Sequence, residues 1–191
     1  MKSFIGLVVL ALSVTFGVAG ASAQSMAMKS DGNPMVGGAA MFKTKNIVEN
    51  AVNSNDHTTL VAAVKAAGLV DTLMSAGPFT VFAPVNSAFN KLPAGTVETL
   101  LKPENKATLV KILTYHVVSG NFDSKAIAKA IKKGKGKATF TTVAGGKLYA
   151  SMNGKSLILT DEKGGRSVVT IADVRQSNGV IHVVDSVLLP N

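Results

Sequence analysis

The sequence predicts an α+β domain, with helices in its first half and an antiparallel sheet in its second. Apolar residues recur at helical spacing between residues 47 and 64 and again between residues 96 and 113. Beyond residue 137, short runs rich in Val, Ile, Leu and Thr alternate with Gly-Gly and Asn-Gly pairs, which is typical of β-hairpins. An apolar run at residues 79–83 lies among the helices, and we expect it to be a central strand that pairs with the later sheet.

Residues 1–23 have the features of a secretory signal peptide. Lys2 precedes an apolar stretch over residues 4–20, and Ala21-Ser22-Ala23 forms a small-x-small cleavage site before Gln24. The stretch is short for a membrane span, which needs about 20 residues. The sequence therefore predicts cleavage after Ala23 and a secreted or periplasmic chain without a transmembrane segment. An uncleaved membrane anchor is the alternative.

Residues 24–44 are rich in Met, Gly and Ala without periodicity, so we expect a flexible leader before the domain. Four of the seven methionines fall here, namely Met26, Met28, Met35 and Met41. Thioethers can bind Cu(I), but no histidine or cysteine accompanies them, so a tail without metal is the simpler interpretation. We expect no cofactor.

We expect the helices of the first half at residues 47–52, after Asp56 as far as Gly68, and at 96–101 and 106–113. The strand at 79–83 should stop at Pro84, with Asn86 capping a short helix over 85–89. Residues 114–118 return to strand composition.

The second half begins with a lysine-rich helix over residues 125–133, capped by Asp123 or Ser124. Five strands should follow at 138–143, 147–152, 155–160, 166–172 and 180–185. No internal repeat is visible, so residues 45–190 form one domain.

Composition limits the classes of function. The chain has no cysteine, which excludes disulfides, thiol catalysis and thiolate metal sites. Its formal net charge is +9 at pH 7, and the excess gathers in one segment. We expect such a segment to attract acidic polysaccharide or anionic lipid, and the alternative is a solvated helix face that only aids solubility. Nucleic acid is not expected, because no aromatic residues alternate with the lysines. The lysines are Lys125, Lys129, Lys132, Lys133, Lys135 and Lys137.

Three segments carry a more specific signal. Residues 78–89 read Pro-Phe-Thr-Val-Phe-Ala-Pro-Val-Asn-Ser-Ala-Phe, residues 115–116 read Tyr-His, and residues 178–185 read Asn-Gly-Val-Ile-His-Val-Val-Asp. In order and spacing they resemble the two signature segments and the central tyrosine-histidine pair of the fasciclin family. The resemblance implies a wedge of antiparallel strands with helices packed alongside. It also implies binding of cell-surface or matrix proteins or glycans, without enzymatic activity.

The resemblance assigns candidate binding residues to these segments, with either direct contact or support of the fold as their role. They are Phe79, Thr80, Val81, Phe82, Ala83, Pro84, Asn86, Phe89, Tyr115, His116, Asn178, Gly179, Val180, Ile181, His182 and Asp185.

The histidines raise the question of a metal or a catalytic base. His116 and His182 lie among β-branched residues, where a buried imidazole needs hydrogen-bond partners. A metal would need a third ligand, and His57 is remote in the sequence. Gly-x-Ser-x-Gly and His-Glu-x-x-His patterns are absent from the sequence. We therefore expect two satisfied core histidines, no metal and no catalysis. A small-ligand carrier is a third possibility, which would require a defined pocket.

Overall fold

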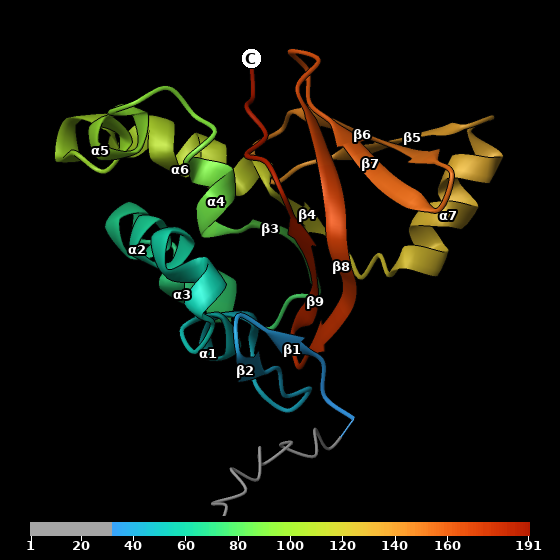
Figure 1. The fold of residues 1–191 in the computed structure, drawn as a ribbon, viewed down its shortest axis with the longest axis horizontal. Helices are drawn as coiled ribbons and strands as arrows, with labels where there is room; N and C mark the ends of the chain where they lie inside the picture. Colours follow the sequence, from blue (N-terminus) through green and yellow to red (C-terminus); the bar gives the residue numbers. More distant parts are fainter. Residues whose placement is uncertain (1–31) are drawn as a thin grey trace, which may run out of the picture.

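The computed structural model describes residues 32–191, in which a seven-stranded sheet separates a group of helices from the single helix α7 (Figure 1). The expected signal peptide at residues 1–23 lies outside the described residues, and so do Met26 and Met28 of the expected leader. Within residues 32–191, no helix is long and apolar enough to cross a membrane. The predicted α+β class is confirmed.

The helices that the sequence predicted are present in the same order, and a further helix at residues 70–74 was not predicted. The helices are α1 (Ile47–Ala51), α2 (Thr58–Ala67), α3 (Val70–Met74), α4 (Asn86–Phe89), α5 (Thr96–Leu100), α6 (Lys106–Tyr115) and α7 (Ser124–Lys133), with 3₁₀ turns at Asn55–His57 and Pro103–Asn105. Asn46 begins α1 with a capping box, since its side chain accepts from the Glu49 amide while the Glu49 carboxylate accepts from the Asn46 amide. Gly68 ends α2 in the left-handed conformation that glycine adopts without strain.

The predicted strands are also present in the predicted order, and the five C-terminal ones are confirmed, whereas the hairpin at residues 35–40 was not predicted. The strands are β1 (Met35–Val36), β2 (Ala39–Ala40), β3 (Phe79–Pro84), β4 (Val117–Ser119), β5 (Lys137–Thr141), β6 (Lys147–Asn153), β7 (Ser156–Thr160), β8 (Arg166–Gln176) and β9 (Gly179–Val184). The large sheet has the order β4-β3-β9-β8-β7-β6-β5.

One strand pair departs from the antiparallel pattern. β3 and β9 run parallel, whereas the other pairs of the sheet are antiparallel. The sheet also curves back on itself, because its first and last strands approach each other. Val118 forms a bridge with Thr142, and the Val143 amide donates to the Val117 carbonyl at 2.7 Å.

The alternation of side chains along β3 and β9 divides the interior into two cores. Val81 of β3 and Ile181 and Val183 of β9 pack under the helices α1, α2, α3 and α6. Phe82 and Val184 point to the opposite side, where α7 and strands β5 to β7 cover them. The two central strands are therefore buried on both faces, as their apolar composition predicts.

The structure corrects the expected start of the domain. Residues 35–40 form a short hairpin, and the Met41 amide donates to the Pro34 carbonyl at 2.9 Å. Val36 and Met41 are only 3% and 2% exposed, so they belong to the core rather than to a flexible leader. Met41 is therefore a core side chain, whereas Met35 of the same hairpin is exposed. Two-residue strands are too short to leave a periodic pattern in the sequence.

The structure also corrects the element that holds the tyrosine-histidine pair. Residues 114–118 were expected to form a strand, but α6 continues through Tyr115 and β4 begins at Val117. Because of the tight turn at His116, both side chains of the pair face the interior rather than opposite sides of a strand.

Asn86 caps a different helix from the one expected. The short helix α4 has no side-chain cap. Instead the Asn86 Oδ1 accepts from the Thr59 amide at 3.0 Å, and its Nδ2 donates to the Asn55 carbonyl at 2.8 Å. The side chain thus satisfies the start of α2 from a neighbouring segment.

Candidate functional site

The two long motif segments lie side by side in the middle of the sheet. The parallel register places Phe79 opposite Gly179 and Pro84 opposite Val184. Gly179 has no room for a side chain, because a Cβ there would overlap the carbonyl of Phe79. Because β3 and β9 are parallel, both strands end at the same edge of the sheet, and the residues that follow the two motif segments lie near each other there.

Tyr115 and His116 form hydrogen bonds from the end of α6 to residues far away in the sequence. The Tyr115 hydroxyl donates to the Lys147 carbonyl at 2.6 Å and accepts from the Glu162 amide at 3.2 Å. Burial raises the pKa of Tyr115 to about 12, so the hydroxyl stays protonated as the donor that this geometry needs. His116 Nδ1 lies 2.8 Å from the Ile112 carbonyl, and its Nε2 accepts from the Leu188 amide at 3.1 Å.

The His116 bonds require the neutral ring with its proton on Nδ1, because Nε2 faces a donor. Burial lowers the pKa of His116, which agrees with that state. Both ring nitrogens are occupied, so His116 offers neither a free base nor a metal ligand.

His182 and Thr80, one from each motif segment, both form hydrogen bonds with the backbone of Phe122. His182 Nε2 lies 2.8 Å from the Phe122 carbonyl, while the Phe122 amide donates to Thr80 Oγ1 at 2.9 Å. His182 Nδ1 accepts from the Asp173 amide at 3.4 Å, so this ring is neutral with its proton on Nε2. Burial lowers the pKa of His182. The ring also stacks on Phe82, with 5.6 Å between the centroids.

Asn178 joins the start of β9 to two helices. Its Oδ1 accepts from the Ile47 amide at 3.1 Å, and its Nδ2 donates to the carbonyls of Leu73 and Ser75 at 2.8 and 2.9 Å. The side chain therefore satisfies the first turn of α1 and the end of α3 together.

Asp185 follows β9 at the opposite end. Its Oδ1 accepts from the Val168 amide at 2.8 Å, and its Oδ2 lies 3.3 Å from Lys91 Nζ. Burial raises the pKa of Asp185, but the bonds from Val168, Ser186 and Lys91 outweigh that effect and lower the pKa overall. The ion pair is open to solvent, because the side chains of Lys91 and Asp185 are 54% and 36% exposed.

Comparison with known proteins identifies this arrangement of motifs. Residues 55–190 match the model of the Fasciclin domain. The chain belongs to the fasciclin domain family. The resemblance carried by the three sequence segments is thereby confirmed.

The relatives of this fasciclin domain come from bacteria and animals. Protein sll1483 of Synechocystis sp. is 48% identical over 160 residues, which cover 82% of this chain and 79% of that protein. Immunogenic protein MPB70 of Mycobacterium bovis is 37% identical over 145 residues, covering 73% of this chain and 66% of that protein. Periostin of Homo sapiens is 31% identical over 137 residues, covering 72% of this chain but 15% of periostin.

Among solved structures, a FAS1 domain pair from the insect cell adhesion molecule Fasciclin I has the same fold. Its TM-score is 0.67 at 18% sequence identity, and the match covers 76% of this chain and 51% of that chain. The fasciclin fold of the present chain therefore agrees with a solved member.

Most motif side chains of this fasciclin domain lie in the interior. Thr80, Val81, Phe82, Ala83, Pro84, Tyr115, His116, Asn178, Gly179, Val180, Ile181 and His182 are buried. Phe79, Asn86, Phe89 and Asp185 are partly exposed. A partner that docks on the folded domain can touch only the second group directly.

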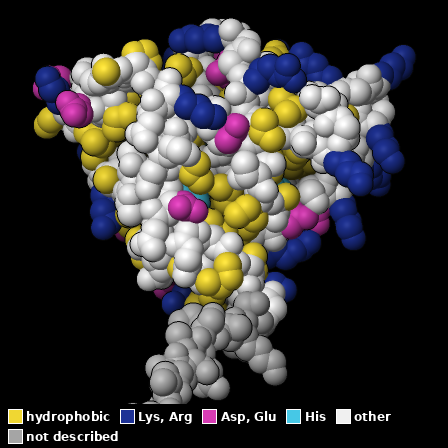
Figure 2. Space-filling model, viewed as in Figure 1, with side chains coloured by type: hydrophobic (Ala, Val, Ile, Leu, Met, Phe, Trp, Pro, Cys, Tyr) yellow, Lys and Arg dark blue, Asp and Glu magenta, His cyan; other side chains and the backbone are white. Residues whose placement is uncertain are grey.

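The lysine-rich segment forms a separate surface. α7 buries Ile127 and Ile131, whereas the six lysines between residues 125 and 137 are exposed. Figure 2 shows Lys and Arg side chains gathered on the side of the molecule where α7 lies. The N-cap Asp123 forms an ion pair with Arg175 at 2.9 Å, and in the described part of the chain none of the six lysines lies in an ion pair.

The third histidine does not extend the site. His57 Nδ1 lies 2.9 Å from Ser54 Oγ, and burial lowers the pKa of His57. Its Nε2 is buried without a hydrogen-bond partner in the structure. Within residues 32–191, no group of three or more His, Cys, Asp and Glu side chains is arranged to hold a metal.

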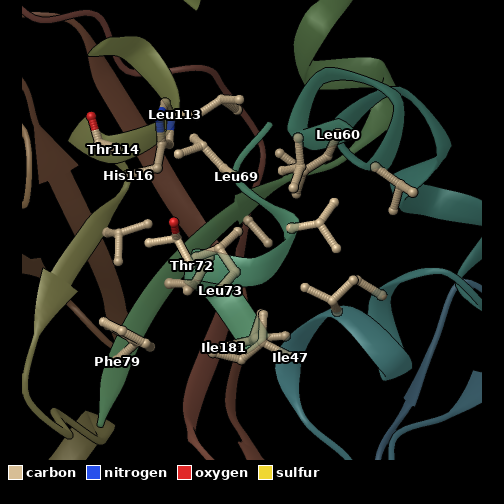
Figure 3. A pocket seen from close by; sticks show the side chains of 18 of the residues that line it. Ile47, Leu60, Leu69, Thr72, Leu73, Phe79, Leu113, Thr114, His116 and Ile181 are labelled. Atoms are coloured by element: carbon tan, nitrogen blue, oxygen red, sulfur yellow. The ribbon is translucent and has the colours of Figure 1, made fainter. Parts of the chain in front are cut away.

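A further feature, which the sequence did not predict, is an apolar cavity beneath the helices. Leu60, Leu69, Leu73 and Ile181 surround it, together with His116 at one end (Figure 3). Its lining comes from α1, α2, α3 and α6 and from strands β3, β4 and β9. The only sequence signal would have been an excess of apolar positions on short helices, which a closely packed core also shows.

Proposed function

We propose that this fasciclin domain is an exported, non-enzymatic binding module that attaches to a cell-surface or matrix protein or glycan. The observation that carries the proposal is the parallel pairing of β3 and β9, because it brings the ends of both motif segments to one edge of the sheet. The solved structure with the same fold comes from a cell adhesion molecule, which supports the same role.

The contact surface in this proposal is the exposed rim at that edge, which we call the strand-end surface. It consists of Ser87, Asn90, Lys91, Asp185 and Ser186. Lys91 Nζ links its two halves through Asp185 and through Ser186 Oγ at 3.0 Å. The buried motif residues then support this surface from within. Exposed charged and hydroxyl groups suit a polar partner surface or a glycan.

Binding of the purified mature chain to intact producing cells tests the strand-end surface. Lys91→Glu should weaken binding about tenfold or more if the side chain lies at the centre of the contact. The melting temperature should change little, because exposed ion pairs contribute about 0 to 1 kcal/mol. Lys155→Glu makes the same charge change at an exposed turn and should bind like the parent chain. Unchanged binding by both Lys91→Glu and Ser87→Arg would reject this surface.

The alternative is polyanion binding through the segment from Lys125 to Lys137, with an acidic polysaccharide or anionic lipid as partner. The exposure of all six lysines and their lack of ion pairs in the described residues favour it. Coulomb attraction of this kind weakens as salt screens it over about 10 Å at 0.1 M.

Replacing four of these lysines by serine tests the alternative on dextran sulfate and on phosphatidylglycerol vesicles. The variant Lys132→Ser, Lys133→Ser, Lys135→Ser, Lys137→Ser should lose binding at low salt. A matched variant with serine at Lys43, Lys102, Lys155 and Lys163 loses the same charge at scattered exposed positions and should retain most of it. Equal binding by the two variants would dispose of a local polyanion site.

A further inference from the structure

The apolar cavity is built from two kinds of wall. Its floor is the buried face of the central strands, where Val81 and Ile181 lie side by side. Its sides are helical and only half-buried, as at Val48 of α1, Val61 of α2 and Val70 of α3. The cavity therefore reaches from the core to the surface, and a small molecule can enter between elements that are already formed.

The lining offers almost no hydrogen-bonding group. Thr114 Oγ1 donates to the Val110 carbonyl of its own helix at 2.7 Å, and both His116 nitrogens are occupied. Lys65 and Thr72 are exposed and belong to the mouth. Neither Asp nor Glu occurs among the lining residues. The inner walls thus have nothing with which to hold a charged or strongly polar group.

The size of the cavity makes this lack of polar groups informative. Its volume is about 70 Å³. A single water needs only about 10 to 15 Å³ of such space, but it also needs two to four polar partners. The cavity has room for several waters and no partners for them, so an apolar molecule is the occupant that gains most from the walls.

We propose that this cavity is a binding site for an uncharged, hydrocarbon-rich small molecule. The site lies on the face of β3 that packs under the helices, whereas α7 and its lysines lie on the opposite side. The inference goes beyond the adhesion proposal and does not depend on it, because the strand-end surface contributes no residue to the cavity.

Fluorescence titration with the uncharged probe N-phenyl-1-naphthylamine tests the site in the purified mature chain. The chain has no tryptophan, so the emission comes from the probe alone. We expect saturable binding of one probe per chain, displaced by decanol and not by decyltrimethylammonium, since the cavity holds no acid to receive a cation. The absence of saturable binding, or equal displacement by the cation, would overturn the proposal.

Two substitutions of the same kind, one in α1 and one directly after it, locate the binding. Val48→Phe places a ring in the cavity, whereas Val52→Phe adds the same ring at a position that is 48% exposed and outside the lining. We expect Val48→Phe to weaken probe binding at least tenfold and Val52→Phe to change it less than twofold. Val61→Phe on α2 is a second filling variant in case Val48→Phe does not fold. A folded filling variant that binds the probe like the parent chain would show that the probe lies elsewhere.

Discussion

At the scale of single residues, the motif histidines act as neutral connectors of the backbone. His116 joins α6 to the segment after β9, and His182 joins β9 to the loop before α7. The sequence predicted satisfied core histidines from their apolar neighbours, and the hydrogen bonds confirm this. It could not identify the bonded atoms, since Leu188 and Phe122 lie far from their partners in the chain.

His116→Ala should lower the melting temperature. The substitution leaves the buried Leu188 amide without its acceptor, and an unsatisfied group of this kind costs about 1 to 3 kcal/mol. Thr108→Ala changes an exposed position of α6, the helix that His116 follows, and should leave the melting temperature almost unchanged. A normal melting temperature combined with lost partner binding would instead make His116 a contact residue.

The free energy of unfolding should fall as the pH drops below 6.5. Burial lowers the pKa of His57, His116 and His182 below the usual histidine value of about 6.5, so the unfolded chain takes up protons that the folded chain does not. Each histidine then removes up to about 1.4 kcal/mol per pH unit between 6.5 and its lower folded pKa, and has no effect above 6.5. Urea unfolding on both sides of this value measures the slope. Identical midpoints on both sides would contradict the neutral-ring assignment.

At the scale of elements, the two motif strands position other parts of the fold. Thr80 and His182 fix Phe122, and the lysine helix α7 starts directly afterwards with Asp123 as its cap. The sequence predicted both motif strands and this helix from turn residues and apolar patterns. It did not predict that β3 runs parallel to β9, because strand composition carries no direction.

Gly179→Ala should destabilise the fold strongly. The new Cβ would overlap the Phe79 carbonyl in the centre of the sheet, so the expected loss is more than about 3 kcal/mol, at the upper end for single substitutions. Gly154→Ala is the control, since its Cβ meets nothing and only the left-handed backbone costs about 1 to 2 kcal/mol. Equal losses in chemical denaturation would mean that the two strands are not in close contact.

Asn86→Ala should release the start of α2. The loss of a helix cap costs about 0.5 to 2 kcal/mol. Ser87→Ala, at the exposed neighbouring position, should cost far less. Amide hydrogen exchange would show the effect of Asn86→Ala at Thr59 and in the first turn of α2. Faster exchange in α4 instead would support the cap that the sequence suggested.

At the scale of the whole molecule, the fold holds three candidate binding regions that lie apart from one another. These are the strand-end surface, the lysine segment and the apolar cavity. The lysine segment could be predicted from the sequence, because charge density is local. The cavity could not, since it depends on how closely short helices approach the sheet.

A chain that begins at Lys43 should be less stable than one that begins at Gly32. It loses Val36 and Met41 from the core, and burial of one such side chain contributes about 1.5 to 3 kcal/mol. Thermal unfolding followed by circular dichroism compares the two chains. Equal melting temperatures would show that the hairpin of β1 and β2 does not stabilise the domain, as expected for a flexible leader.

The central claim is that both motif segments meet as parallel neighbours and bring their ends to one edge. Nuclear Overhauser contacts between the backbones of β3 and β9 in solution measure this most directly. The account predicts contacts in parallel register, with Val81 opposite Ile181 and Pro84 opposite Val184. An antiparallel pattern, or no contact between the two strands, would contradict it.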